Sequence, residues 1–600
     1  MIHRRSTTLK AALTAAFLTS TPAISASLES FGLDPSETVL VTAQRTETSI
    51  ESSLSRADVI TRKDILRSQA RDIKALLETQ AGIDVARTGG AGGQTSVFMR
   101  GANSNHVLVL IDGVRVASAG TGGFTWELLD LATIERIEIV RGPRAARWGS
   151  DAIGGVIQIF TRQAQGVSVQ ATVGSYGERS AALAFGGADQ SLTASTRRLD
   201  GFSSQNEAGF AFDPDDDGFS NHQLAGQGEL NLPAGQIRWS ARWLEGEVEF
   251  DQGVSDVEQY AANLQYQTDL NDWAVNIDAG LYRDRLESTT PFGISENITR
   301  RSQLSVLAEK SLGNAGTWLV GADGWKESGV NVGSWRQDRN HWGLWSALDG
   351  QTGPVSYALS ARLDDDERYG SETTAQAALG WQATSAIRVF GNFGEGFRSP
   401  NFSQLFSPGF GGLFAGNPNL APETSTSYEL GLDWALSDRQ RFTASAFDTK
   451  IDDLINFSGT DFQAINIAKA RIEGLELTHR WSSDRWSTQL NWTWQKPVDR
   501  ALDQPLLRRP KNKGSAVISH QLGDRTLGAE LVYLGQRVDV GQAPLSAYTL
   551  LNLTASWQLT PQWSVMTRLE NITQRDYEPL VGFNAPGRSA QLSVVWRPEQ

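Results

Sequence analysis

Cysteine is absent from this chain of 600 residues, and histidine is scarce, with only 6 residues scattered along it. The absence of cysteine excludes disulfide bonds, thiol catalysis and cysteine-ligated metals. We also find no nucleophile–base pair, histidine cluster or cofactor motif in the sequence. The chain is therefore predicted not to be an enzyme and to carry no redox cofactor.

Long apolar runs are missing as well. The longest resemble 107–111, far short of the roughly 18 residues that a membrane-spanning helix needs. Positive charge is in deficit, because the formal net charge is −14 at pH 7. This balance argues against a nucleic-acid partner and favours an acidic exposed surface or cation binding.

The N-terminus has the order of an export signal. Arg4, Arg5 and Lys10 precede or flank a short apolar stretch at 11–18, and small residues follow up to Ala26. A charged, an apolar and a small-residue region in this order is typical of a cleaved secretory signal. We assign residues 1–26 to the signal peptide, which predicts an exported protein.

Short segments of alternating polarity fill the chain after about residue 165. In 428–436, 486–495 and 551–559, large apolar residues dominate every second position. This period is that of a β-strand with one apolar face, and it also describes a soluble sandwich with one wet face. The export signal, the segment length of about 10 residues and tryptophan at segment ends favour a transmembrane barrel.

Such a barrel has to close, because lipid offers no partner for an open strand edge. Residues 165–600 would give each of about 22 strands roughly 20 residues with its connection, and a lumen of that width would leak unless it were filled. The compact α/β-like segment 46–163 directly precedes the first strand. The predicted fold is therefore dominated by β-structure: an antiparallel transmembrane β-barrel of about 22 strands, closed by an N-terminal α/β plug domain.

Motifs in both halves of the chain carry a family resemblance. Residues 98–115 contain Phe-Met-Arg-Gly and then His-Val-Leu-Val-Leu-Ile-Asp-Gly-Val-Arg. Residues 134–157 contain Ile-Glu-Arg-Ile-Glu-Ile-Val-Arg-Gly-Pro and Ala-Ile-Gly-Gly-Val-Ile, and 416–423 read Gly-Asn-Pro-Asn-Leu-Ala-Pro-Glu. In these motifs, the chain resembles the TonB-dependent outer-membrane receptors over nearly all of its mature length.

The resemblance implies active transport of a scarce nutrient across the bacterial outer membrane, powered through TonB by the inner-membrane proton gradient. It implies a periplasmic segment at 27–45 that holds a TonB box at 37–43. An alternating, β-prone segment of this kind suits strand addition to a partner's sheet edge. The TonB-binding residues are Glu37, Thr38, Val39, Leu40, Val41, Thr42 and Ala43. We expect a monomer surrounded by outer-membrane lipids.

Within this family, the chain resembles the cobalamin receptors most closely, in segments such as 100–107, 149–155, 469–474 and 505–509. The resemblance implies cobalamin as the ligand, held by loops of the plug and of the barrel. The alternative for each contact is a solvent-facing loop residue. The implied contacts are Gln94, Ser96, Asn103, Thr121 and Gly122 on the plug, and Gln252, Asn297 and Arg508 on the barrel.

An acidic run lies at 212–219, where four carboxylates fall within five residues. Like charges this close repel one another, and a hard cation with oxygen ligands relieves the repulsion. The run begins like an EF-hand loop, but its twelfth position is Leu224 and not a bidentate glutamate, so an EF-hand is rejected. A solvated acidic loop is the alternative.

The cobalamin receptors are similar in this region, because aspartates on two neighbouring extracellular hairpins bind calcium in them. The resemblance therefore implies a calcium site made by Asp213, Asp215, Asp217, Asp251 and Asp256.

Two departures from the family pattern stand out. Ser203 stands where the family carries a further aspartate, which thins the implied calcium site. The chain continues with Arg-Pro-Glu-Gln after Trp596, whereas such barrels usually end on an aromatic residue that assists assembly.

Rival functions differ in testable ways. A receptor for a ferric siderophore, or for another corrinoid or metal chelate, would differ only in its ligand. A passive porin would lack the plug motifs, and an outer-membrane hydrolase would need a Ser/His pair that we do not find.

Overall fold

The structure is a computed structural model of the chain, and it describes residues 40–41, 45, 48–50, 52–409, 414–458 and 462–598. The predicted signal peptide at 1–26 lies outside the described residues. So do five residues of the predicted TonB box, which are Glu37, Thr38, Val39, Thr42 and Ala43.

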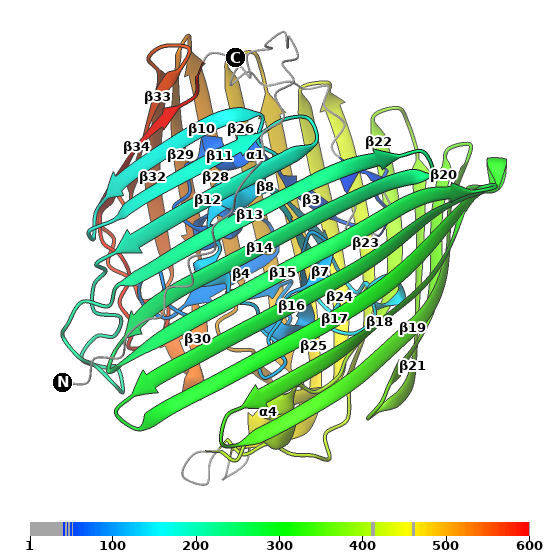
Figure 1. Cartoon of the computed structure of the whole chain (residues 1–600), viewed down its shortest axis with the longest axis horizontal. Helices are drawn as coiled ribbons and strands as arrows, with labels where there is room; N and C mark the ends of the chain where they lie inside the picture. Colours follow the sequence, from blue (N-terminus) through cyan, green and yellow to red (C-terminus); the bar gives the residue numbers. More distant parts are fainter. Residues whose placement is uncertain are drawn as a thin grey trace.

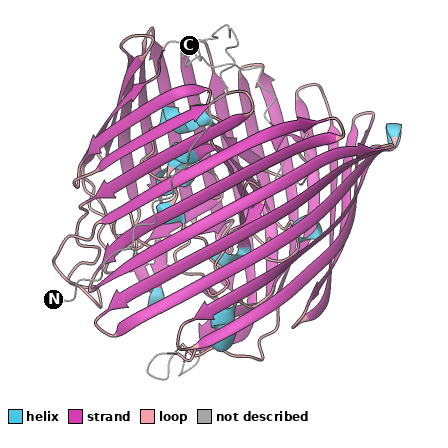
Figure 2. Ribbon diagram, viewed as in Figure 1, coloured by secondary structure: helices cyan, strands magenta, loops and turns pink. Residues whose placement is uncertain are grey.

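Within the described chain, 22 antiparallel strands form a closed barrel (Figure 1 and Figure 2). The first strand, β10 (Gly166–Gly174), pairs with the last, β34 (Ser589–Trp596), so that no strand edge is left open. This architecture confirms the predicted fold class. The strands between them are β11 (Arg179–Gly186), β12 (Gln190–Leu199), β13 (Phe219–Leu232), β14 (Gly235–Phe250), β15 (Gly253–Leu270), β16 (Trp273–Thr290), β17 (Gly293–Ser311), β18 (Thr317–Asn331), β19 (Trp335–Thr352), β20 (Val355–Asp366), β21 (Gly370–Gln382), β22 (Ile387–Arg398), β23 (Glu423–Ser437), β24 (Gln440–Ser458), β25 (Gln463–Ser482), β26 (Trp486–Asp499), β28 (Asn512–Leu522), β29 (Arg525–Leu534), β32 (Tyr548–Gln558) and β33 (Trp563–Glu570).

The alternation seen in the sequence separates the two faces of the barrel wall. In β26, Trp492 is 41% exposed, whereas its neighbours Asn491 and Thr493 are buried. In β23, Tyr428 and Leu430 are likewise exposed on the outer face. Because successive side chains of a strand point to opposite faces, the apolar set faces lipid and the polar set faces the lumen.

The two rims of the barrel differ. At the rim where β10 begins and β34 ends, the strands are joined by short turns such as 233–234 and 271–272. Longer connections lie at the opposite rim, after β12, β22, β26, β29 and β33. We call these the short-turn rim and the long-loop rim. The long connections carry α4 (Phe402–Phe406), β27 (Gln504–Pro505), β30 (Arg537–Asp539), η5 (Val540–Gln542) and β31 (Ala543–Leu545), and η4 (Gly313–Ala315) lies at the short-turn rim.

The predicted plug is an α/β domain that lies inside the barrel, drawn in blue in Figure 1. Its main sheet has five strands in the order β3-β8-β9-β6-β7, and β6 runs parallel to β9. A hairpin, β4–β5, lies beside it. The elements are β3 (Ala57–Ile60), α1 (Arg62–Ser68), α2 (Ile73–Glu78), β4 (Ile83–Arg87), β5 (Thr95–Met99), η1 (Ser104–His106), β6 (Val107–Ile111), β7 (Val114–Arg115), η2 (Trp126–Leu128), η3 (Leu131–Thr133), β8 (Ile134–Arg141), α3 (Ala145–Trp148) and β9 (Gly155–Thr161).

Local sequence accounts for several elements of the plug. Thr61 caps α1 by accepting the backbone N–H of Asp64, whose carboxylate accepts the Thr61 N–H in return, so two orphan donors are satisfied. A continuous apolar run forms β6, whereas β8 places isoleucines between charged residues; both strands fill the main core cluster together with α2 and β4. Among the described helices, none is long and apolar enough to cross a bilayer.

Candidate functional site

Loops of the plug meet barrel loops at the long-loop rim. The side-chain amide of Asn401, which caps α4, donates to the Thr121 carbonyl at 2.8 Å. The Arg509 guanidinium, in the connection after β26, donates to Asn103 Oδ1 at 2.5 Å. Both plug residues were implied as ligand contacts, so the structure places them where barrel loops converge on the plug.

The five implied plug contacts lie on three neighbouring loops and a strand. Gln94 and Thr121 are exposed, whereas Ser96 in β5, Asn103 and Gly122 are half-buried. Gly122 has a φ of 72°, a backbone conformation that favours glycine and allows the tight turn at the loop tip.

The loop before Gln94 packs against the connection after β12. A Cβ added at Gly89 would lie 2.5 Å from Ser204 Cβ, and one added at Gly92 would lie 2.7 Å from Phe219 Cβ. The plug loop at 88–94 therefore touches the barrel close to the acidic run.

The three implied barrel contacts are spread around the long-loop rim. Gln252 is exposed in the tight turn between β14 and β15, with a φ of 62°. Asn297 Oδ1 in β17 accepts from the Asn331 amide at 2.9 Å. Arg508 forms an ion pair with Asp539 at 2.8 Å. Arg508 is therefore held by a barrel aspartate, while its neighbour in sequence makes the plug contact.

Sequence reasoning missed Arg509 and Asn401 as residues of this rim. Arg509 follows Arg508 in the segment 505–509, and nothing in the sequence separates their roles. Asn401 could have been found, because Asn-x-x-Gln at 401–404 is a capping pattern, and Asn401 accepts the Gln404 N–H at 2.8 Å.

The acidic run lies against the β14–β15 turn, but the five predicted metal ligands are not gathered at one point. Asp217 is buried, and its carboxylate accepts the Ser204 N–H at 2.6 Å. Asp251 is also buried: one oxygen accepts the Asp213 N–H at 3.0 Å, and the other has no hydrogen-bond partner among the described residues. Asp215 is exposed.

Asp256 lies on the outer face of β15. Tyr260 and Leu264, which share its parity, are exposed, whereas Gln259 and Ala261 are buried toward the lumen. Within the described residues, no group of three or more His, Cys, Asp or Glu side chains is arranged to hold a metal ion. The predicted set therefore lacks a common centre in this structure, with Asp217 and Asp251 as its buried pair.

Charge and burial act on Asp217 together. Burial raises its pKa to about 6, against the effect of the hydrogen bond from Ser204 and with help from the negative charges of Asp251 and Asp215. The Ser203 hydroxyl, where the family carries an aspartate, instead donates to the Asp213 carbonyl at 2.9 Å.

A buried ion cluster fastens the plug to the other side of the barrel. Arg100 is 3% exposed, and its Nε and one terminal nitrogen each donate to a Glu476 oxygen at 3.0 Å. That terminal nitrogen also lies 2.7 Å from Glu429 Oε1, and the guanidinium sits 4.5 Å over the Phe447 ring. Since each charge is paired, the cluster tolerates burial.

Two residues of the predicted TonB box and one residue after it have described contacts. Leu40 and Val41, in β1 (Leu40–Val41), pair antiparallel with β2 (Thr48–Ser49). Arg45 forms an ion pair with Asp323 of β18 at 2.8 Å and lies 4.4 Å over the Trp148 ring. Arg45, just after the box, is thereby held between the plug and the barrel wall.

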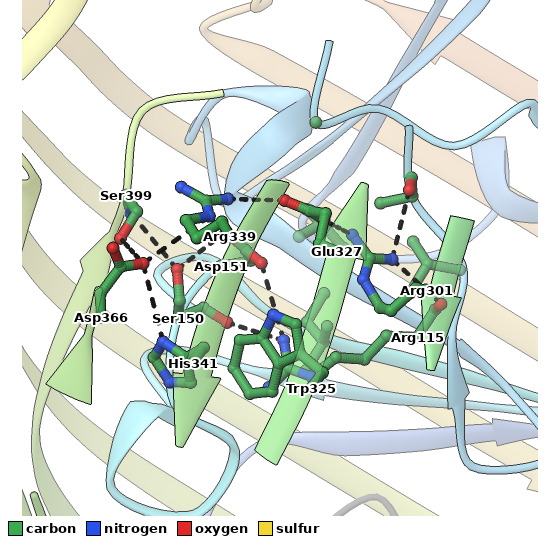
Figure 3. A pocket seen from close by; sticks show the side chains of 15 residues that line it. Arg115, Ser150, Asp151, Arg301, Trp325, Glu327, Arg339, His341, Asp366 and Ser399 are labelled. Carbon is green, nitrogen blue, oxygen red and sulfur yellow. Dashed lines mark hydrogen bonds and ion pairs between the residues drawn. The ribbon is translucent and has the colours of Figure 1, made fainter. Parts of the chain in front are cut away.

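A small polar pocket lies between the plug and β17–β22 (Figure 3). Arg301 donates to the Arg115 and Ala117 carbonyls at 3.2 Å and pairs with Glu327, which also binds Arg339 at 2.8 Å. The pocket walls are thus held by charge-assisted hydrogen bonds from barrel to plug.

Comparison with known proteins identifies this arrangement. The family model for the TonB-dependent receptor-like β-barrel matches residues 169–572, and the model for the TonB-dependent receptor plug domain matches residues 49–156. The chain belongs to the TonB-dependent receptor family. The receptor is therefore an outer-membrane protein, in a family of receptors and transporters rather than enzymes. Long barrel loops face outward and short turns face the periplasm, so the long-loop rim is extracellular.

Relatives of the receptor match its sequence along almost its whole length. It is 30% identical to the vitamin B12 transporter BtuB of Photobacterium profundum over 94% of its own chain and 95% of that protein. It is 28% identical to the vitamin B12 transporter BtuB of Vibrio cholerae, over 94% of its own chain and 96% of that protein.

Solved structures share the fold of the receptor at lower identity. The ferric enterobactin receptor PfeA of Pseudomonas aeruginosa is 18% identical with a TM-score of 0.78, covering 93% of this chain and 100% of that one. The siderophore receptor PirA of Acinetobacter baumannii is 16% identical with a TM-score of 0.78, and the match covers 93% of this chain and 100% of that one. At these identities the likeness concerns the fold alone.

Proposed function

We propose that this receptor transports cobalamin across the outer membrane, driven through TonB by the inner-membrane proton gradient. The observation that carries the proposal is the 30% identity to a vitamin B12 transporter over 94% of the chain. The plug loops at the extracellular rim support it, because they present polar, partly exposed groups such as Gln94 and Thr121 between converging barrel loops.

A ferric siderophore, or another corrinoid or metal chelate, is the second candidate ligand. The solved structures that share the fold include receptors for ferric enterobactin, but 18% identity does not carry a ligand with it. The two candidates separate in calorimetry of the purified receptor. Cobalamin should bind with heat and ferric enterobactin should not, and the reverse result would move the assignment to siderophores.

TonB is the proposed periplasmic partner, with Glu37 to Ala43 as its binding strand. The proposal is supported by the pairing of Leu40 and Val41 with β2, because these two residues have the extended backbone that strand addition requires. Cobalamin at the rim would release the segment, and pulling on it would move plug structure. We also propose that residues 1–26 are a signal peptide, because their charged, apolar and small-residue regions follow the order of an export signal. We also propose that the receptor works as a monomer in outer-membrane lipids.

Calcium is proposed at the acidic run. The buried pair Asp217 and Asp251 fits a hard cation, since Asp251 leaves one buried carboxylate oxygen without a hydrogen-bond partner among the described residues. Asp213 and Asp215 would complete the set, whereas the outward position of Asp256 does not support a role for it. A bound cation would neutralise repulsion between the connection after β12 and the β14–β15 turn.

A further inference from the structure

A large cavity lies between the plug and one side of the barrel, toward the periplasm. Its volume is about 870 Å³, which is the size of a small-molecule site (roughly 300–1,000 Å³). Most of the barrel residues that line it belong to β13–β18, beside the start of β12, and examples are Gln227, Ser240, Gln265, Asn276 and Ser305. All lie in the halves of their strands next to the short-turn rim, so the cavity extends toward the periplasmic end of the lumen.

The lining suits passage of a polar solute. Amide side chains of Gln and Asn recur along both walls, from Gln158 on the plug to Gln267 on β15. Such groups offer donors and acceptors to a moving ligand, and charged side chains such as Arg136, Asp278 and Glu309 line the cavity beside them.

Contacts across the cavity edge include neutral hydrogen bonds as well as charged ones. Here Gln303 donates to the Gly113 carbonyl at 2.9 Å and Asn263 to the Asp112 carbonyl at 3.0 Å, both from neutral amides. The opposite side holds the plug through the buried Arg100 cluster. Charged contacts lie at the cavity edge as well: Arg45 pairs with Asp323 at 2.8 Å, and Arg301 donates to the Arg115 and Ala117 carbonyls. Opening this side therefore requires these contacts to break together with the neutral hydrogen bonds, which contribute about 0.5–1.5 kcal/mol each.

A contact between plug and barrel lies between this cavity and the small pocket of Figure 3. Arg115 and Trp325 line both the cavity and the small pocket of Figure 3, and that pocket is also lined by Gly122, an implied ligand contact. The Arg115 guanidinium lies 4.3 Å over the Trp325 ring, which stacks on His341 with centroids 3.8 Å apart.

The barrier lies at one edge of the plug sheet. Arg115 lies in β7, a two-residue strand at the edge of the five-stranded sheet, whereas Trp325 belongs to the barrel wall. Moving an edge strand breaks pairing on one side only.

We propose that the transported ligand passes between the plug and the β13–β18 wall, through this cavity, and that the Arg115–Trp325 contact is the barrier that plug movement opens. The proposal rests on the proposed uptake function and adds the route. The rest of the plug stays docked on the β23–β28 side during transport.

The absence of native cysteine allows a direct test. Ser305→Cys places a thiol in the cavity, and Ser556→Cys is the matched control, because Ser556 of β32 is also a half-buried serine near the short-turn rim. Ser556 faces the lumen, since Trp557 beside it is 43% exposed. Each variant, and the cysteine-free chain, is treated with biotin maleimide in cells. Labelling, outer-membrane abundance, cobalamin binding and initial cobalamin uptake are then measured.

The label on Ser305→Cys should lower the uptake rate by about tenfold or more while cobalamin still binds. Labelled Ser556→Cys and the treated cysteine-free chain should transport normally. Equal uptake by labelled and unlabelled Ser305→Cys, or an equal block in labelled Ser556→Cys, would overturn the route. Failure of the untreated native chain to take up cobalamin would instead refute the proposed substrate. In that case, uptake of ferric enterobactin is measured in labelled Ser305→Cys and labelled Ser556→Cys. The route stands only if the label blocks uptake in Ser305→Cys and not in Ser556→Cys.

Discussion

Replacing Arg100 by methionine removes the cation at the centre of the plug–barrel interface. The side chain is buried, and it bridges Glu429 and Glu476, which come from two different strands of the wall. Methionine fills similar space without charge, so the change leaves two buried carboxylates short of their nearest partner. We expect the plug to lose docking stability while the barrel stays closed.

The size of the loss follows from the contacts. Breaking a buried, hydrogen-bonded ion pair by removing one partner costs about 3–5 kcal/mol. Arg141 remains 3.8 Å from Glu476 and compensates part of its charge, so we expect a value near the lower end. This corresponds to roughly a hundredfold rise in the population of the opened plug.

Hydrogen exchange measures that population, because buried strand amides exchange through local opening. Amides of β6 and β9 should exchange about a hundredfold faster in Arg100→Met. Arg471→Met is the control, since Arg471 pairs with Asp448 at 2.8 Å on the outer face and is partly exposed. Such pairs contribute about 0–1 kcal/mol. Unchanged plug exchange in Arg100→Met, or an equal effect in Arg471→Met, would refute the reasoning. Adding Glu476→Gln to Arg100→Met should recover part of the loss.

The remaining predictions concern the partner, the cation and processing. Proline at Val39 or Val41 should abolish uptake and spare cobalamin binding, because proline lacks the N–H that strand addition uses; unchanged uptake in both variants would remove the TonB-box assignment. The raised pKa of Asp217, about 6, means that the fold favours its protonated form. Without calcium, exchange protection of 200–218 should therefore fall as the pH rises through about 6, and calcium affinity should fall as the pH drops through the same value. Asp217→Asn should remove both effects, and pH-independent calcium binding by the native chain would contradict them. N-terminal sequencing of the mature protein should begin near Ala26, and an intact Met1 would exclude the signal peptide.

The strands and their faces could be read from the sequence, because alternation is a local property. Trp492 between Asn491 and Thr493 already specified which side meets lipid. The plug motifs could be recognised for a related reason: they are runs of adjacent residues whose turns require glycine or proline at fixed places.

Pairings between distant residues could not be read in this way. Arg100 meets Glu476 across 376 positions of sequence, and only closure of the barrel around the plug brings them together. Asp256 was joined to the acidic run by the family resemblance, but strand parity turns it to the outer face. The choice between Arg508 and Arg509 depended on loop geometry that no local pattern records.

Energy-dependent uptake of cobalamin tests the central claim most directly. The receptor is expressed in cells that lack their own cobalamin receptor, and accumulation of labelled cobalamin is followed with and without TonB. We predict accumulation that requires TonB and stops when a protonophore collapses the inner-membrane gradient, with ferric enterobactin excluded. Cells that accumulate ferric enterobactin but no cobalamin, or that take up cobalamin equally without TonB, would contradict the account.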